Sequence, residues 1–264
     1  MSVRIEKQGK VWTVVHNRPE ARNAMDPASA EALMEAFIAF DRDAEAAVAV
    51  LWGEGGAFCA GYDLKHAAAL DPGGLAAHAY PFDERPPPRG PMGPTRLALD
   101  KPVIAAVAGP AVAGGFELAL WCDLRVMEAS AYFGVYCRRW GVPLIDGGTV
   151  RLPRLVGAGR AMELILTGRR LPAEEALRIG ACEKVVPDGT AREHAEAMAR
   201  EIARFPQACL RADRRSARMQ EGLPLREAMR NEWHNSIGVF AAEGSAGAKR
   251  FAEGRGRGGD FGDL

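Results

Sequence analysis

Short apolar runs alternate with segments of helical spacing along the first half of the chain. Three runs are β-branched or apolar throughout and are predicted strands: residues 11–16, 47–52 and 102–108. Between the first two, Leu33, Phe37 and Phe40 share one face of a predicted helix that Asp26 can cap. A strand, a helix and a strand in succession predict a right-handed parallel crossover. The third run has no polar position, which is typical of a strand buried on both faces.

The pattern becomes mainly helical from Gly147 onward. Five segments have helical spacing: residues 158–166, 172–179, 190–204, 207–219 and 223–239. Two more strands are predicted at 123–127 and 184–187, and a short helix at 114–121 precedes the first of them. We therefore predict an α/β core over residues 1–200, followed by a helical C-terminal region over residues 201–264.

A proline-rich segment, residues 71–94, interrupts the core pattern. It holds seven of the 17 prolines and several glycines, so we predict a long irregular loop. Core-type strands flank the segment, which argues against a domain boundary there. His66 and His78 lie at its edges and are predicted to be surface residues.

Charge and cysteine content narrow the class of protein. Lys plus Arg equals Asp plus Glu at 34 each, so we expect no nucleic-acid partner and no anionic membrane partner. No apolar run is long enough to span a bilayer, and the N-terminal residues lack a signal-peptide pattern. The five cysteines are scattered without a CxxC pair, which favours a reduced cytoplasmic protein with no metal site.

Three glycine-bearing stretches directly follow or join predicted strands: residues 57–64, 109–119 and 133–149. Ligands of parallel sheets bind at the carboxyl ends of strands, and glycine lets backbone approach a ligand closely. Free amides at such a helix start can hold a developing oxyanion. Glu117 follows Gly114 by three residues among apolar neighbours, a position suited to proton transfer beside an enolate.

Several of these motifs occur together in one order along the chain. They are Asn17-Arg18-Pro19 with Asn23-Ala24, residues 58–64, residues 101–107, Gly114-Gly115-Phe116-Glu117-Leu118 and Gly147-Gly148-Thr149. Together they resemble the crotonase (enoyl-CoA hydratase/isomerase) superfamily. The resemblance implies a crotonase-like ββα spiral core that binds acyl-CoA, a helical C-terminal trimerisation region, and a homotrimer or hexamer.

The resemblance also implies roles for individual residues. The backbone amides of Tyr62 and Gly114 match the family's oxyanion hole, and Glu117 matches its first catalytic glutamate. The positions on the coenzyme A side are Asn23, Ala24, Ala60, Gly61, Tyr62, Asp63, Leu64 and Gly115, with Asp63 expected to hold its turn in shape. Coenzyme A is part of the acyl-CoA thioester substrate, so no separate cofactor is expected.

The chain departs from the family at the second glutamate. That position reads Cys137, interpreted as a buried thiol and not as a nucleophile. Asp146 is a nearby acid whose place is similar to that of a catalytic aspartate in dienoyl-CoA isomerases, and it is equally suited to capping its loop. Hydration of a 2-enoyl-CoA is the expected reaction. The alternatives are an enoyl- or dienoyl-CoA isomerase using Glu117 and Asp146, and a weakly catalytic CoA-thioester-binding scaffold.

Overall fold

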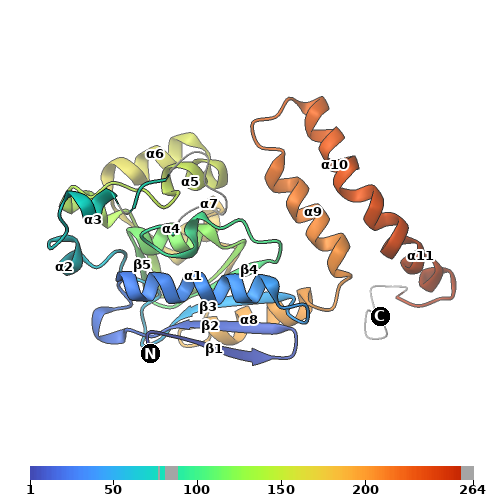
Figure 1. The fold of residues 1–264 in the computed structure, drawn as a ribbon, viewed down its shortest axis with the longest axis horizontal. Coiled ribbons are helices and arrows are strands. Elements are labelled where there is room, and N and C mark those ends of the chain that lie inside the picture. Colours follow the sequence, from blue (N-terminus) through green and yellow to red (C-terminus); the bar gives the residue numbers. More distant parts are fainter. Residues whose placement is uncertain (77, 81–88, 257–264) are drawn as a thin grey trace. The chain divides into compact units, whose positions relative to one another are not determined.

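The computed structural model describes residues 1–76, 78–80 and 89–256. The chain divides into two compact units, Met1–Ala199 and Arg200–Leu264. Figure 1 follows the elements of both units from the N-terminus to the C-terminus. Within the described ranges, no helix is long and apolar enough to cross a membrane.

The first unit is built on a six-stranded sheet in the order β1-β2-β3-β4-β6-β9. Its strands are β1 (Val3–Gln8), β2 (Val11–His16), β3 (Val48–Gly53), β4 (Val103–Val107), β6 (Leu124–Glu128) and β9 (Lys184–Val186). The β1–β2 pair is antiparallel, and every other neighbouring pair is parallel. The predicted parallel pairing of β2 with β3 is confirmed, and every residue of β4 is buried as expected.

A second sheet of three short strands was not predicted. It contains β5 (Pro110–Val112), β7 (Tyr132–Gly134) and β8 (Arg170–Pro172). Strand β5 pairs with β7 in parallel, and β8 is antiparallel to β7. A strand of three residues is too short to show an alternating pattern, so its pairing depends on distant partners.

Eight α-helices accompany these sheets in the part of the chain that is described up to residue 202. They are α1 (Pro27–Arg42), α2 (Leu64–Ala67), α3 (Pro72–Ala76), α4 (Gly114–Trp121), α5 (Gly148–Val156), α6 (Ala158–Thr167), α7 (Ala173–Ile179) and α8 (Ala191–Ile202). Helix α1 contacts β1 and β2 and buries Leu33, Phe37 and Phe40 on the predicted face. The Asp26 side chain accepts a hydrogen bond from the Ser29 amide at 2.8 Å, as expected of its cap.

The proline-rich segment is not irregular throughout, and this corrects the prediction for its first part. Residues Pro72–Ala76 form α3, because Asp71 Oδ1 accepts a hydrogen bond from the Gly74 amide at 2.7 Å and so supplies an N-terminal cap. Pro94–Arg96 forms a 3₁₀ turn. Residue 77 and residues 81–88 lie outside the described part of the chain.

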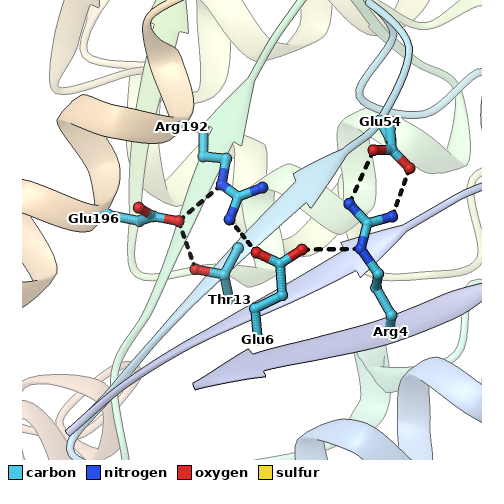
Figure 2. Close-up of polar contacts among 6 residues, drawn as sticks. All are labelled: Arg4, Glu6, Thr13, Glu54, Arg192 and Glu196. Carbon is cyan, nitrogen blue, oxygen red and sulfur yellow. Dashed lines mark hydrogen bonds and ion pairs between the residues drawn. The ribbon is translucent and has the colours of Figure 1, made fainter. Parts of the chain in front are cut away.

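Helix α8 is fixed to the edge of the larger sheet by a network of polar side chains (Figure 2). Its members are Arg4, Glu6, Thr13, Glu54, Arg192 and Glu196. Arg192 of α8 bonds both Glu6 of β1 and Glu196, and Glu196 accepts a bond from Thr13 Oγ1 at 2.8 Å. Arg4 extends the network to Glu54 through two further bonds.

The second unit is helical, as predicted. It contains α9 (Gln207–Met219) and α10 (Leu225–Val239), which contact each other. A π-helical turn, Phe240–Gly244, leads into α11 (Ser245–Ala252).

Candidate active site

A cavity of 390 Å³ opens in the first unit. All three glycine-bearing stretches contribute to its wall, through Ala60 and Tyr62, through Gly114 and Glu117, and through Asp146. The structure therefore brings together the segments that the sequence marked as a joint site. Most of the remaining wall is apolar.

The first feature of the cavity is a pair of backbone amides. Met25 donates to the Gly61 carbonyl at 2.7 Å and accepts from the Asp63 amide at 2.8 Å. In this parallel pairing the Tyr62 amide points away from Met25. A Cβ built on Gly61 would lie only 3.1 Å from the Gly114 amide nitrogen, so the two chain segments are in close contact. Tyr62 and Gly114 therefore lie at neighbouring positions of the wall.

Close packing at the start of α4 requires glycine at Gly115 and leaves little room for a side chain at Gly114. A Cβ on Gly114 would lie 2.5 Å from the sulfur of Met92, and one on Gly115 would lie 2.1 Å from the Cys59 carbonyl oxygen. Gly114 is the first residue of α4, whose opening amides have no partner within the helix. This helix start can stabilise negative charge on a bound oxygen. Gly115 packs against Cys59 and is not part of the cavity wall.

Glu117 lies on α4, and its side chain is buried at 3% exposure. Its Oε1 accepts hydrogen bonds from the amides of Asp146 at 3.0 Å and Gly148 at 2.8 Å. Burial and the nearby charge of Asp146 raise the pKa of Glu117 to about 7, although the two amides and Arg151 act in the opposite direction. A carboxyl group with this pKa can both donate and accept a proton near neutral pH.

Asp146 is the second buried carboxyl group of the cavity. Its Oδ1 accepts hydrogen bonds from the Met92 amide at 3.1 Å and from Thr95 Oγ1 at 2.5 Å. Burial raises the pKa of Asp146, partly offset by the bond from Thr95. The two roles considered for Asp146 are therefore compatible, because one oxygen fixes the loop of Met92 and Thr95 while the residue lines the cavity.

Cys137 lines the same cavity from the 3₁₀ turn Tyr136–Trp140. The thiol is buried, as expected. Burial, and to a smaller extent the charge of Glu117, raise the pKa of Cys137, so the thiol stays protonated at neutral pH. It can neither act as a base nor attack as a thiolate there.

The residues assigned to the coenzyme A side divide into two kinds. Asn23 is fully buried and holds its own loops together: Nδ2 donates to the carbonyls of Glu54 and Ala57, and Oδ1 accepts from the Arg18 amide. Asp63 caps α2 through the Lys65 amide and pairs with Arg18 at 3.3 Å. These side chains shape the loops and have little capacity left for a ligand.

The other kind has apolar side chains. Ala60 and Leu64 line the cavity, and Leu64 is exposed. Ala24 is half-buried, and its carbonyl accepts a hydrogen bond from Arg18. Contact of these residues with coenzyme A stays a prediction.

His78 was predicted to be a surface residue, and the structure places it half-buried at the cavity. It lines the cavity and its Nε2 lies 3.1 Å from the hydroxyl of Tyr62. Arg96 donates to the His78 carbonyl at 2.7 Å and so holds this segment near the cavity. Burial, with the charge of Arg89, lowers the pKa of His78. No local sequence signal predicts this contact, because it depends on pairing between separate loops.

An apolar cavity that combines a helix start with two buried carboxyl groups is typical of an enzyme that acts on a carbonyl compound and stabilises the resulting anion. The family model described as "Enoyl-CoA hydratase/isomerase" matches residues 6–258. The chain belongs to this family.

Individual relatives agree with the family. The chain is 36% identical over 259 residues to "Enoyl-CoA hydratase EchA19" of Mycobacterium tuberculosis, covering 95% of this chain and 93% of the relative. It is 35% identical to a "Carnitinyl-CoA dehydratase" of Salmonella typhimurium, covering 87% and 85%. A crystal structure of an enoyl-CoA hydratase from Mycobacterium tuberculosis H37Rv superposes with a TM-score of 0.86 at 34% identity, covering 96% of each chain. These likenesses confirm the crotonase-like α/β fold.

Proposed function

We propose that this protein is a lyase that adds water to a 2-enoyl-CoA thioester. The observation that carries the proposal is the buried Glu117. Its pKa is about 7, and it lines the same cavity as Tyr62 and Gly114. The names of two relatives, a hydratase and a dehydratase, both describe addition or removal of water at an acyl-CoA. Family membership and cavity chemistry therefore support the same reaction class.

In the proposed reaction the thioester oxygen accepts hydrogen bonds from the amides of Tyr62 and Gly114. The hydroxyl oxygen of water bonds to C3 of the acyl group, and the C2–C3 double bond becomes an enolate held at those amides. C2 then takes up a proton. Glu117 gives C2 this proton. The ionised Asp146, which holds the water in place of the glutamate absent at Cys137, accepts the proton released when the O–H bond of the water breaks. The sum is one water added, with no oxidant or reductant.

Glu117 and Asp146 are suited to share one proton between them. The Asp146 carboxylate is among the causes that raise the pKa of Glu117, so the two groups titrate as a coupled pair. A site with one protonated and one ionised carboxyl can hold water at one group and supply a proton from the other.

We further propose that coenzyme A enters only as part of the substrate and that the reaction needs no separate cofactor or metal. Ala24, Ala60 and Leu64 would contact the coenzyme A portion, with Asn23 and Asp63 shaping their loops. We also propose a homotrimer or hexamer, formed through the helical C-terminal region, working in the cytoplasm.

A substrate comparison tests the reaction class. Purified protein is incubated with 2-enoyl-CoA and, separately, with 3-enoyl-CoA of the same chain length, and the products are analysed by mass spectrometry. The proposal predicts a mass gain of one water from the 2-enoyl compound, with loss of the gain in Glu117→Gln. A shifted double bond without a mass gain would identify an isomerase. Binding of both compounds without product would identify a scaffold.

A further inference from the structure

Arg151 bonds the segment carrying Asp146 and the segment carrying Thr95 at once. Its Nη1 donates to the Asp146 carbonyl at 2.8 Å, and its Nη2 donates to the Thr95 carbonyl at 2.7 Å. Arg151 is half-buried on α5, one helical turn after Gly147. A Cβ on Gly147 would lie 2.1 Å from Arg151 Nη1, so the glycine leaves room for the guanidinium to pack against the backbone.

Both residues that Arg151 holds also bond the buried carboxyl groups. The Asp146 residue held through its carbonyl also donates its amide to Glu117 Oε1. The Thr95 residue held at the other end donates its hydroxyl to Asp146 Oδ1. One planar guanidinium therefore fixes a loop that orients Glu117 and a turn that orients Asp146.

We propose that Arg151 is the positioning residue of the acid–base pair, Glu117 and Asp146. Its positive charge also favours the ionised form of both carboxyl groups. Arg151 need not touch the substrate, and it acts through the backbone of Asp146 and Thr95. The inference rests on the proposed function for its kinetic consequences only. Its geometric and electrostatic consequences hold in the free protein.

The electrostatic part has a clear direction. The charge of Arg151 acts to lower the pKa of Glu117 and the pKa of Asp146. The charge of Arg96 also acts to lower the pKa of Asp146. The charges of Glu117 and Asp146 in turn act to raise the pKa values of the groups around them, which are Cys137, Cys59, Tyr62 and His78. Removing the Arg151 charge should therefore raise both carboxyl pKa values further and move the acidic limb of the activity profile to higher pH.

Three variants separate charge from geometry. Arg151→Gln removes both the positive charge and the two guanidinium hydrogen bonds. Arg151→Lys keeps the charge but cannot make both hydrogen bonds. Arg160→Gln removes an exposed arginine from α6 and serves as the charge-matched control. We expect Arg151→Gln to lower kcat about 10- to 100-fold with a much smaller change in KM. Arg151→Lys should keep the pH midpoint of the parent while kcat stays at least about fivefold low.

A readout independent of turnover distinguishes this inference from the proposed function. Carbon NMR of protein with labelled glutamate follows the titration of Glu117 in the free protein, with Glu117→Gln assigning the signal. A higher midpoint in Arg151→Gln, with the parent midpoint in Arg160→Gln, supports the inference even if no hydration occurs. Unchanged midpoint and unchanged kcat in Arg151→Gln overturn it. If Arg151→Gln fails to fold, full kcat in Arg151→Lys overturns the positioning role.

Discussion

At the scale of single residues, two buried titratable groups couple folding to pH in opposite directions. Glu117 has a folded pKa of about 7, above its ordinary value of 4.5. His16 has a folded pKa of about 4, below its ordinary value of 6.5, because burial and the charge of Arg18 disfavour the protonated ring. Stability is therefore reduced above neutral pH by the first group and reduced in acid by the second.

Glu117→Gln should make the protein more stable at alkaline pH. The folded state favours the protonated carboxyl, so wild-type stability falls as pH rises from 4.5 towards 7. Glutamine keeps the neutral form, and we expect a gain of about 1–3 kcal/mol in the free energy of unfolding at pH 8. Urea unfolding at pH 4 and pH 8 measures it, with little difference predicted at pH 4. An equal gain at both pH values would show that ionisation is not the cause.

His16→Leu should reduce acid sensitivity. His16 is 1% exposed, and neither ring nitrogen has a hydrogen-bond partner among the described residues. Wild-type stability that is present above pH 6.5 is lost as pH falls through 4, because the unfolded chain binds the proton first. We expect the variant to lose about 1–3 kcal/mol less than wild type between pH 7 and pH 4. Urea unfolding between pH 7 and pH 4 measures this. An equal loss in the free energy of unfolding for wild type and variant would contradict it.

At the scale of elements, length decides how much the sequence could predict. Strands β2, β3 and β4 are long enough to be predicted as continuous apolar or β-branched runs, and helices α1 and α9 are long enough to show helical spacing. The strands of the smaller sheet have three residues each, and the caps and contacts that form α3 are local details within a proline-rich segment.

The candidate site shows the same limit in finer detail. Gly114 and Glu117 stand in one short motif, so sequence could predict their proximity. Arg151 on α5 and His78 in a separate loop contact the site through carbonyl groups of distant segments, and no pattern of side chains encodes such contacts. The sequence therefore did not predict the contact of His78 with Tyr62.

The network in Figure 2 gives a prediction for α8. Arg192 and Glu6 pair across elements that are far apart in sequence, with side-chain exposures of 26% and 33%. Glu6→Gln and Arg192→Gln in a double-mutant cycle should show a coupling of about 0.5–1 kcal/mol, reduced by salt because both groups are partly solvated. Urea unfolding at low and high ionic strength measures it. A coupling near zero at low salt would show that the pair does not fix α8.

At the scale of the whole molecule, the second unit leaves a large apolar stripe exposed on α10. The stripe consists of Leu225, Met229, Trp233 and Ile237, continued by Phe240. Their spacing of four residues puts them on one face of the helix. A stripe of this size favours contact with other chains, which supports the proposed oligomer.

Trp233→Glu should therefore lower the oligomeric state. We expect the parent to elute as three or six chains in size-exclusion chromatography with light scattering. The variant should shift towards monomer, because a charge would be buried in the contact. His234→Glu introduces the same charge at the next exposed position of α10 and serves as the control. A monomeric parent, or a variant with unchanged mass, would contradict the role of the stripe.

We propose that Glu117 and Asp146 perform hydration without the second glutamate of the family. Steady-state kcat for hydration of one 2-enoyl-CoA by wild type, Asp146→Asn and Cys137→Ala tests this most directly. The account predicts at least about a hundredfold loss in Asp146→Asn and less than about a threefold change in Cys137→Ala. Full activity in Asp146→Asn together with a large loss in Cys137→Ala would contradict it.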